Sequence, residues 1–115
     1  MATTILIVDD YAPFRESARR LLESEGFEVV GEAESGVAAL RAAKELHPDV
    51  VLLDVQLPDF DGFEVADRLH RLDPAPTVIL TSSRDEYAPL IASSSARAFV
   101  LKDELSGAAL ASALA

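Results

Sequence analysis

The chain has 115 residues, half of them apolar, and a formal net charge of −10 at pH 7. This length and composition predict one globular domain, and the charge argues against nucleic acid or an anionic membrane as a direct partner. The absence of cysteine excludes disulfides, and the chain starts with a short apolar run rather than a signal peptide or membrane anchor, which predicts a cytoplasmic protein.

The first part of the chain alternates short apolar runs with helical patterns. The run TILIVDD, residues 4–10, is too short for a helix and apolar on both faces, which predicts a buried strand. A helix is expected from about Pro13, because apolar residues then recur with helical spacing. A second strand at 27–33 precedes a helix that Ser35 can cap and Pro48 ends.

The middle of the chain repeats this pattern. The run DVVLLD, residues 49–54, predicts a third strand. Apolar residues at helical spacing predict a helix from about 62 to 72, and the Asp-Pro-Ala-Pro turn after it leads to TVILTS. This last run, residues 77–82, predicts a fourth strand.

The last part of the chain completes the alternation. A short helix is expected to begin near Pro89, whose ring would make this region irregular. The run AFVL, residues 98–101, predicts a fifth strand, and an Ala- and Leu-rich helix is expected from Glu104. Strands that alternate with helices predict an α/β fold with a parallel sheet covered on both faces.

Polar side chains stand at the carboxyl ends of these expected strands, namely Asp9, Asp10, Asp54, Thr81 and Lys102. In open parallel sheets, ligands bind outside this edge, where the strand order reverses. If the first and third strands are neighbours, three carboxylates converge, and each close pair costs about 1–4 kcal/mol. A hard divalent cation such as Mg²⁺ would remove that penalty. Lys102 and Thr81 could then hold a phosphate-sized anion, and an aspartate can be the nucleophile in phosphoryl transfer.

The motifs at these positions resemble a response-regulator receiver domain, the phosphorylatable half of two-component signalling. The resemblance rests on VDD, LLDVQLPDFDG, LTS and FVLK, each after one expected strand and in the family's order, and it covers essentially the whole chain. It implies a flavodoxin-like (βα)5 three-layer sandwich with a five-stranded parallel sheet in the order 2-1-3-4-5. It implies one receiver domain over residues 1–115 with no effector domain, and therefore a stand-alone receiver or a fragment.

The resemblance also implies a metal site and a phosphoacceptor. Asp54 is expected to accept the phosphoryl group. Asp10 and Asp54 are expected to bind Mg²⁺ (or Mn²⁺) directly, Asp9 through water, and Gln56 through its backbone carbonyl. The phosphoryl donor would be a histidine kinase or a phosphotransfer protein.

The remaining roles concern the phosphoryl oxygens and the response to them. Thr81, Ser82 and Lys102 are expected to bind these oxygens. Thr81 would move toward the phosphoryl group, and Phe99 would follow it inward as the second part of the switch. The face of the fourth helix, fifth strand and last helix would then contact a partner or a second copy of the chain, because the last helix carries only small and apolar residues after Glu104.

One departure from the family pattern is Asp103, which follows Lys102 where many members have a proline in a cis bond. The main alternative is a receiver-like interaction module that is not phosphorylated. A haloacid-dehalogenase-type phosphohydrolase is disfavoured because it needs a second acid where Gln56 stands. A flavin electron carrier is disfavoured because acids stand where its phosphate loop would lie. The chain is therefore expected to be a switch rather than a turnover enzyme.

Overall fold

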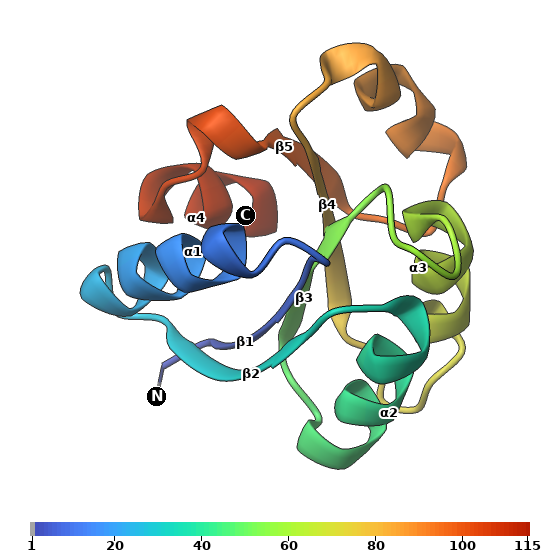
Figure 1. Cartoon of the computed structure of the whole chain (residues 1–115), viewed down its shortest axis with the longest axis horizontal. Helices are drawn as coiled ribbons and strands as arrows, with labels where there is room; N and C mark the ends of the chain where they lie inside the picture. Colours follow the sequence, from blue (N-terminus) through green and yellow to red (C-terminus); the bar gives the residue numbers. More distant parts are fainter. Residues whose placement is uncertain (1) are drawn as a thin grey trace.

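The computed structural model describes residues 2–115 as alternating strands and helices (Figure 1). The strands are β1 (Thr4–Val8), β2 (Glu28–Ala33), β3 (Val50–Asp54), β4 (Thr77–Ser82) and β5 (Ala98–Leu101). The helices are α1 (Ala12–Ser24), α2 (Gly36–Leu46), α3 (Gly62–His70) and α4 (Gly107–Leu114), with the 3₁₀ segments η1 (Asp85–Ser93) and η2 (Lys102–Glu104). All five expected strands are therefore confirmed.

The five strands form one parallel sheet in the order β2-β1-β3-β4-β5. This is the expected order 2-1-3-4-5, and it places β1 directly beside β3. The strand order reverses between these two strands, so the carboxyl ends of β1 and β3 flank the point where ligands bind in such sheets.

Helices cover both faces of the sheet, which confirms the three-layer sandwich. Figure 1 shows α1 and α4 on one side of the sheet and α2 and α3 on the other. Ile7 and Leu52 belong to the core on the α1 and α4 side, whereas Leu6 and Leu53 belong to the core on the other side. The central strands lack polar alternation because both of their faces are buried. Among residues 2–115, no helix is long and apolar enough to cross a membrane.

Two expected helix starts are wrong. The helix expected to begin near Pro89 begins at Asp85, and it is a 3₁₀ helix with Pro89 inside it. Proline lacks an N–H and clashes with the preceding turn, which explains why this segment is not a regular α-helix. The last helix begins at Gly107 rather than Glu104, because η2 intervenes and the Ser106 hydroxyl accepts a hydrogen bond from Ala109 N at 2.9 Å as the N-cap.

Gly62 brings the start of α3 against the tip of β3. A Cβ at this position would lie 2.5 Å from the Asp54 carbonyl oxygen and 2.7 Å from Val55 Cα. The Gly62 N–H donates to the Val55 carbonyl at 2.6 Å. Backbone thus packs directly on backbone behind Asp54, and only glycine allows this approach.

Candidate functional site

The polar residues at the carboxyl edge of the sheet point to the same face of the sheet, because side chains alternate along each strand. Successive side chains of a strand point to opposite faces, so a residue shares its face with the residue two positions earlier. The relevant preceding residues all belong to the core on the α1 and α4 side: Ile7 before Asp9, Leu52 before Asp54, Ile79 before Thr81 and Val100 before Lys102. The four polar side chains therefore converge over the same face of the sheet.

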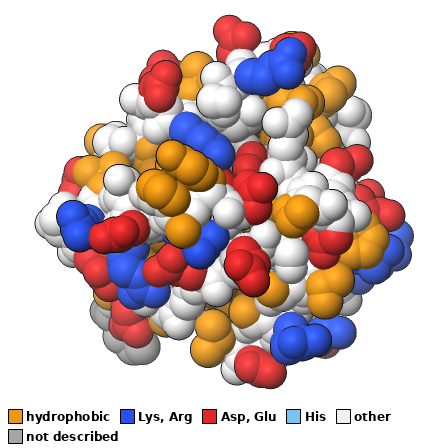
Figure 2. Space-filling view, viewed as in Figure 1, with side chains coloured by type: hydrophobic (Ala, Val, Ile, Leu, Met, Phe, Trp, Pro, Cys, Tyr) orange, Lys and Arg blue, Asp and Glu red, His pale blue; other side chains and the backbone are white. Residues whose placement is uncertain are grey.

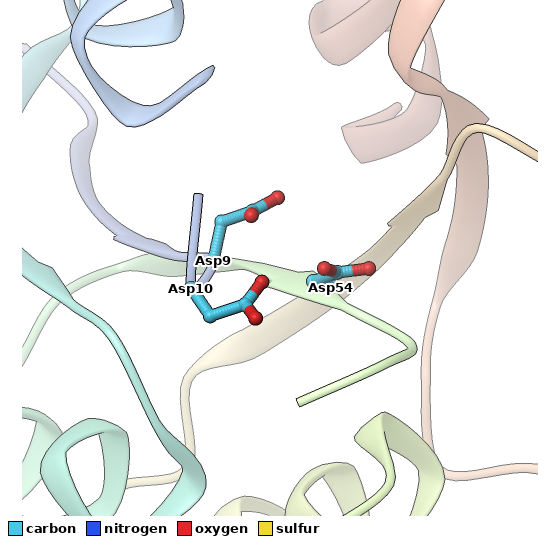
Figure 3. A group of neighbouring side chains, drawn as sticks. All are labelled: Asp9, Asp10 and Asp54. Carbon is cyan, nitrogen blue, oxygen red and sulfur yellow. The ribbon is translucent and has the colours of Figure 1, made fainter. Parts of the chain in front are cut away.

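Three carboxylates meet at this edge, from Asp9, Asp10 and Asp54 (Figure 3). Each offers an oxygen that lies within 4.8 Å of the oxygens of the other two. Asp9 is fully buried and Asp54 is 5% exposed, whereas Asp10 is exposed. Figure 2, viewed as in Figure 1, shows acidic side chains in the middle of the visible surface. Negative charges this close repel one another, at about 1–4 kcal/mol per close pair.

Lys102 is the cation of the cluster. Its Nζ lies 2.5 Å from Asp9 Oδ2 and 3.4 Å from Asp54 Oδ2. Lys102 is also the first residue of η2, and the only cis peptide bond among residues 2–115 is Asp73–Pro74, so the Lys102–Asp103 bond is trans. One ammonium group cannot balance three carboxylates, and the cluster keeps an excess of negative charge.

The pKa values of two groups reflect this imbalance. Burial raises the pKa of Asp54, the negative charge of Asp9 raises it further, and Lys102 opposes both effects only in part. Burial lowers the pKa of Lys102, but Asp9 and Asp54 raise it by more, so that the net pKa lies above the usual value. Lys102 therefore stays protonated, and a further positive charge near Asp54 would favour its ionised form.

The donor set fits a hard divalent cation. Carboxylate and carbonyl oxygens with room for water are what Mg²⁺ and Mn²⁺ prefer. Asp10, Asp54 and Gln56 all line a cavity of about 580 Å³ at this edge. The Gln56 N–H donates to Asp54 Oδ1 at 3.2 Å, so the backbone of Gln56 lies beside the cluster.

The two hydroxyl residues after Leu80 have different surroundings. Thr81 lies opposite Asp54 in the β3–β4 register, is fully buried, and its Oγ1 has no hydrogen-bond partner among residues 2–115. Ser82 points to the other face, and its Oγ accepts a hydrogen bond from Arg84 N at 3.1 Å. Ser83, which was not among the expected site residues, lines the cavity with Asp54 and Lys102. Strand alternation from Thr81 could have identified Ser83.

The acids of the turn after β3 cap helices instead of joining the cluster. Asp59 accepts hydrogen bonds from Gly36 N at 2.7 Å and Val37 N at 2.9 Å, at the start of α2. Hydrogen bonds from the Val37 and Gly36 backbone lower the pKa of Asp59. Asp61 accepts a hydrogen bond from Glu64 N at 2.8 Å as the N-cap of α3. The turn is therefore tied to α2 and α3.

Phe99 lies at a second cavity, of about 480 Å³, between η1, β5 and α4. It is half-buried, pairs with Leu80 in the β4–β5 register, and packs against the core on the α2 and α3 side. Across the sheet edge, Gln56 Nε2 donates to the Tyr87 hydroxyl at 3.1 Å. Thus both β5 and η1 connect the region of the carboxylates to the second cavity.

Comparisons with known proteins agree with this geometry. A family model described as "Response regulator receiver domain" matches residues 5–114. "Virulence factors putative positive transcription regulator BvgA" of Bordetella pertussis is 40% identical over 106 residues, which cover 90% of this chain and 51% of that protein. The chain spans about half the length of the curated relatives that head the comparison.

Solved structures extend the similarity to the whole fold. The signal receiver domain of the putative response regulator NarL from Mycobacterium tuberculosis superposes with a TM-score of 0.87 at 36% identity, covering 98% of this chain and 97% of that chain. CheY in the CheX–CheY–BeF₃–Mg²⁺ complex from Borrelia burgdorferi is similar, with a TM-score of 0.84 at 25% identity over 96% of this chain and 85% of the matched chain.

Proposed function

Because this chain belongs to the response regulator receiver domain family, we propose that it is a phosphorylation-activated switch of a two-component system, with Asp54 as the phosphoacceptor. The observation that carries the proposal is the placement of Asp54. It ends a central strand in a cavity that also holds two further carboxylates and the ammonium group of Lys102. In this proposal residues 1–115 are one receiver domain, which acts in the cytoplasm.

The proposed reaction is phosphoryl transfer from a phosphohistidine of a histidine kinase or a phosphotransfer protein. An Asp54 carboxylate oxygen attacks the phosphorus atom, the P–N bond breaks, and the imidazole leaves with the bonding electrons. Lys102 and the Thr81 hydroxyl would bind the phosphoryl oxygens. Mg²⁺ or Mn²⁺, held by Asp10, Asp54 and the Gln56 carbonyl with Asp9 behind them, would neutralise charge on the transferring group. The structure of the CheY complex with BeF₃ and Mg²⁺ supports this assignment for a related fold.

The test of the proposal is the intact mass of the protein after incubation with acetyl phosphate and Mg²⁺. A gain of one phosphoryl group is expected, and chelation of the metal should prevent it. No mass gain under any of these conditions would favour the alternative, a receiver-like interaction module that is not phosphorylated.

The switch is proposed to run from Thr81 to Phe99. The buried Thr81 hydroxyl has no partner among the described residues, so a phosphoryl oxygen on Asp54 would supply one. Movement of Thr81 would affect its neighbours on β5, and Phe99 could then turn inward from the second cavity. Phosphorylation would thereby change the surface formed by η1, β5 and α4.

This surface is the proposed contact for a partner or a second copy of the chain. Beside Phe99 its cavity is lined on α4 by Ala109, Ser112 and Ala113, which permit close backbone approach. We expect sedimentation to show a larger species when beryllofluoride is added to the wild type, and Ala109→Glu with Ser112→Glu to prevent it. If the activated wild type stays monomeric and the charged variant behaves identically, the homodimer is excluded and the surface would serve a different partner.

A further inference from the structure

The ring of Phe14 lies against the ammonium group of Lys102. Lys102 Nζ lies over the ring of Phe14, 4.6 Å from its centroid. Phe14 belongs to the first turn of α1, packs against the core on the α1 and α4 side, and lines the same cavity as the carboxylates. Lys102 therefore has three close contacts in the cavity: the carboxylates of Asp9 and Asp54, and the face of an aromatic ring.

These three contacts respond differently to events at the site. In the proposed function, Asp54 becomes an acyl phosphate and both carboxylates face a divalent cation, so both ion pairs with Lys102 weaken during the reaction. The contact with Phe14 involves neither carboxylate, so it does not depend on the partners that the carboxylates have. Because the Lys102 side chain is only 19% exposed, the ring acts on a partly desolvated cation, where such an interaction is stronger than on an open surface.

We propose that Phe14 is a positioning residue, which uses the face of its ring to hold the Lys102 ammonium group at the cavity while the carboxylates bind metal and phosphate. Lysine carries its charge on a long flexible stem, and the ring of Phe14 limits where that charge can settle. The effect on phosphoryl transfer rests on the proposed function, but the contact itself can be tested without it.

The contact is tested first by NMR on the metal-free protein. Lys44 and Lys102 are the only lysines in the chain, so [¹³Cε]lysine labelling yields two signals. Lys44 is exposed in the last turn of α2 and is the internal reference. The ring current of Phe14 should shift the Lys102 ε protons upfield of those of Lys44, both without metal and with Mg²⁺. Phe14→Leu should remove this shift.

Phe27→Leu is the matched control for this measurement. Phe27 packs against the same core cluster as Phe14, but it precedes β2 at the opposite edge of the sheet. Phe27→Leu should therefore leave the upfield shift of Lys102 intact. Lys102 ε protons that coincide with those of Lys44 in the wild type, or that are unchanged by Phe14→Leu, would overturn the proposal.

The consequence for the reaction is tested with fluorinated rings at position 14. Fluorine substitution weakens the negative face of the ring progressively and changes its volume little, so it separates the electrostatic effect from core packing. From phenylalanine to pentafluorophenylalanine, the rate of phosphorylation by acetyl phosphate should fall by about 2- to 5-fold. The same series at Phe27 should leave the rate unchanged.

The two measurements separate failure of this inference from failure of the proposed function. Equal rates across the series at position 14, in a protein that is phosphorylated, would overturn the positioning role. If the wild type accepts no phosphate at all, the proposed function fails, and the shift of the Lys102 signal still decides whether Phe14 holds the ammonium group.

Discussion

Asp54→Asn is expected to abolish the mass gain that acetyl phosphate and Mg²⁺ produce in the wild type. The amide keeps the shape of the side chain but lacks the nucleophilic oxygen. Neither neighbouring acid can replace it, because Asp9 is fully buried with Oδ2 at 2.5 Å from Lys102 and Asp10 is exposed on the solvent side of the cluster. Retention of the full mass gain by the variant would contradict the assignment of Asp54.

Asp61→Asn is the matched control for this variant. Asp61 lies in the turn after β3 and caps α3, and asparagine caps helices about as well as aspartate. This variant should therefore fold normally and gain the same mass as the wild type. Loss of the mass gain here as well would show that the turn, rather than the Asp54 carboxylate, is what the reaction requires.

The same Asp54 variant should be more stable than the wild type in the absence of metal. The pKa of Asp54 is raised by burial, so the folded protein binds this proton more tightly than the unfolded chain does. The stability linked to this proton is present below the unfolded pKa and is lost as the pH rises through the folded pKa. Asparagine does not ionise, so Asp54→Asn avoids that loss at pH 7, and its Tm should be higher than the Tm of the wild type. This difference in Tm should shrink as the pH is lowered toward the pKa of Asp54 in the unfolded chain.

Asp10→Asn is expected to raise the stability of the metal-free protein and to remove the stabilisation by Mg²⁺. Removing one of three close carboxylates relieves repulsion of about 1 kcal/mol. A ligand at 100 times its Kd stabilises a protein by about 2.7 kcal/mol, and the variant should lose this gain because it lacks a metal ligand. Thermal unfolding with and without Mg²⁺ measures both effects.

Glu45→Gln is the control for charge alone. Glu45 is exposed on α2, away from the sheet edge, so its neutralisation should leave the Mg²⁺ response unchanged. An Asp10→Asn protein that responds fully to Mg²⁺ would refute the metal role of Asp10. If Asp10→Asn is less stable than the wild type when both are free of metal, repulsion among the three carboxylates does not destabilise the protein.

Most of the fold follows from local pattern. The apolar runs at 4–8 and 50–54 are too short and too uniformly apolar for anything but central strands, and both lie where the structure has them. The Ser35 cap was also predictable, because its hydroxyl accepts from Ala38 N within one helical turn. The start of η1 was not, because Pro89 disfavours an α-helix without specifying which residues form the 3₁₀ turns that replace it.

The acidic residues show how far the roles of the site residues could be predicted from the sequence. The sequence places five aspartates in two short segments, 9–10 and 54–61, and local context marks only Asp61, three residues before Glu64, as a helix cap. Asp59 accepts hydrogen bonds from the start of α2, a helix that precedes β3 in the chain. That pairing depends on how α2 packs beside the turn, which no local pattern encodes.

By itself, then, the sequence determined which segments are strands, which helices follow them, and that carboxylates, a hydroxyl and a lysine stand at strand ends. These features depend on hydrogen bonding and burial within a few residues of chain. The tertiary structure alone decided that Asp59 caps α2 and that the ring of Phe14 lies against Lys102. Both contacts join segments that are far apart in the chain: the turn after β3 meets the start of α2, and the residue after β5 meets the first turn of α1. They form only when the helices have packed on the sheet.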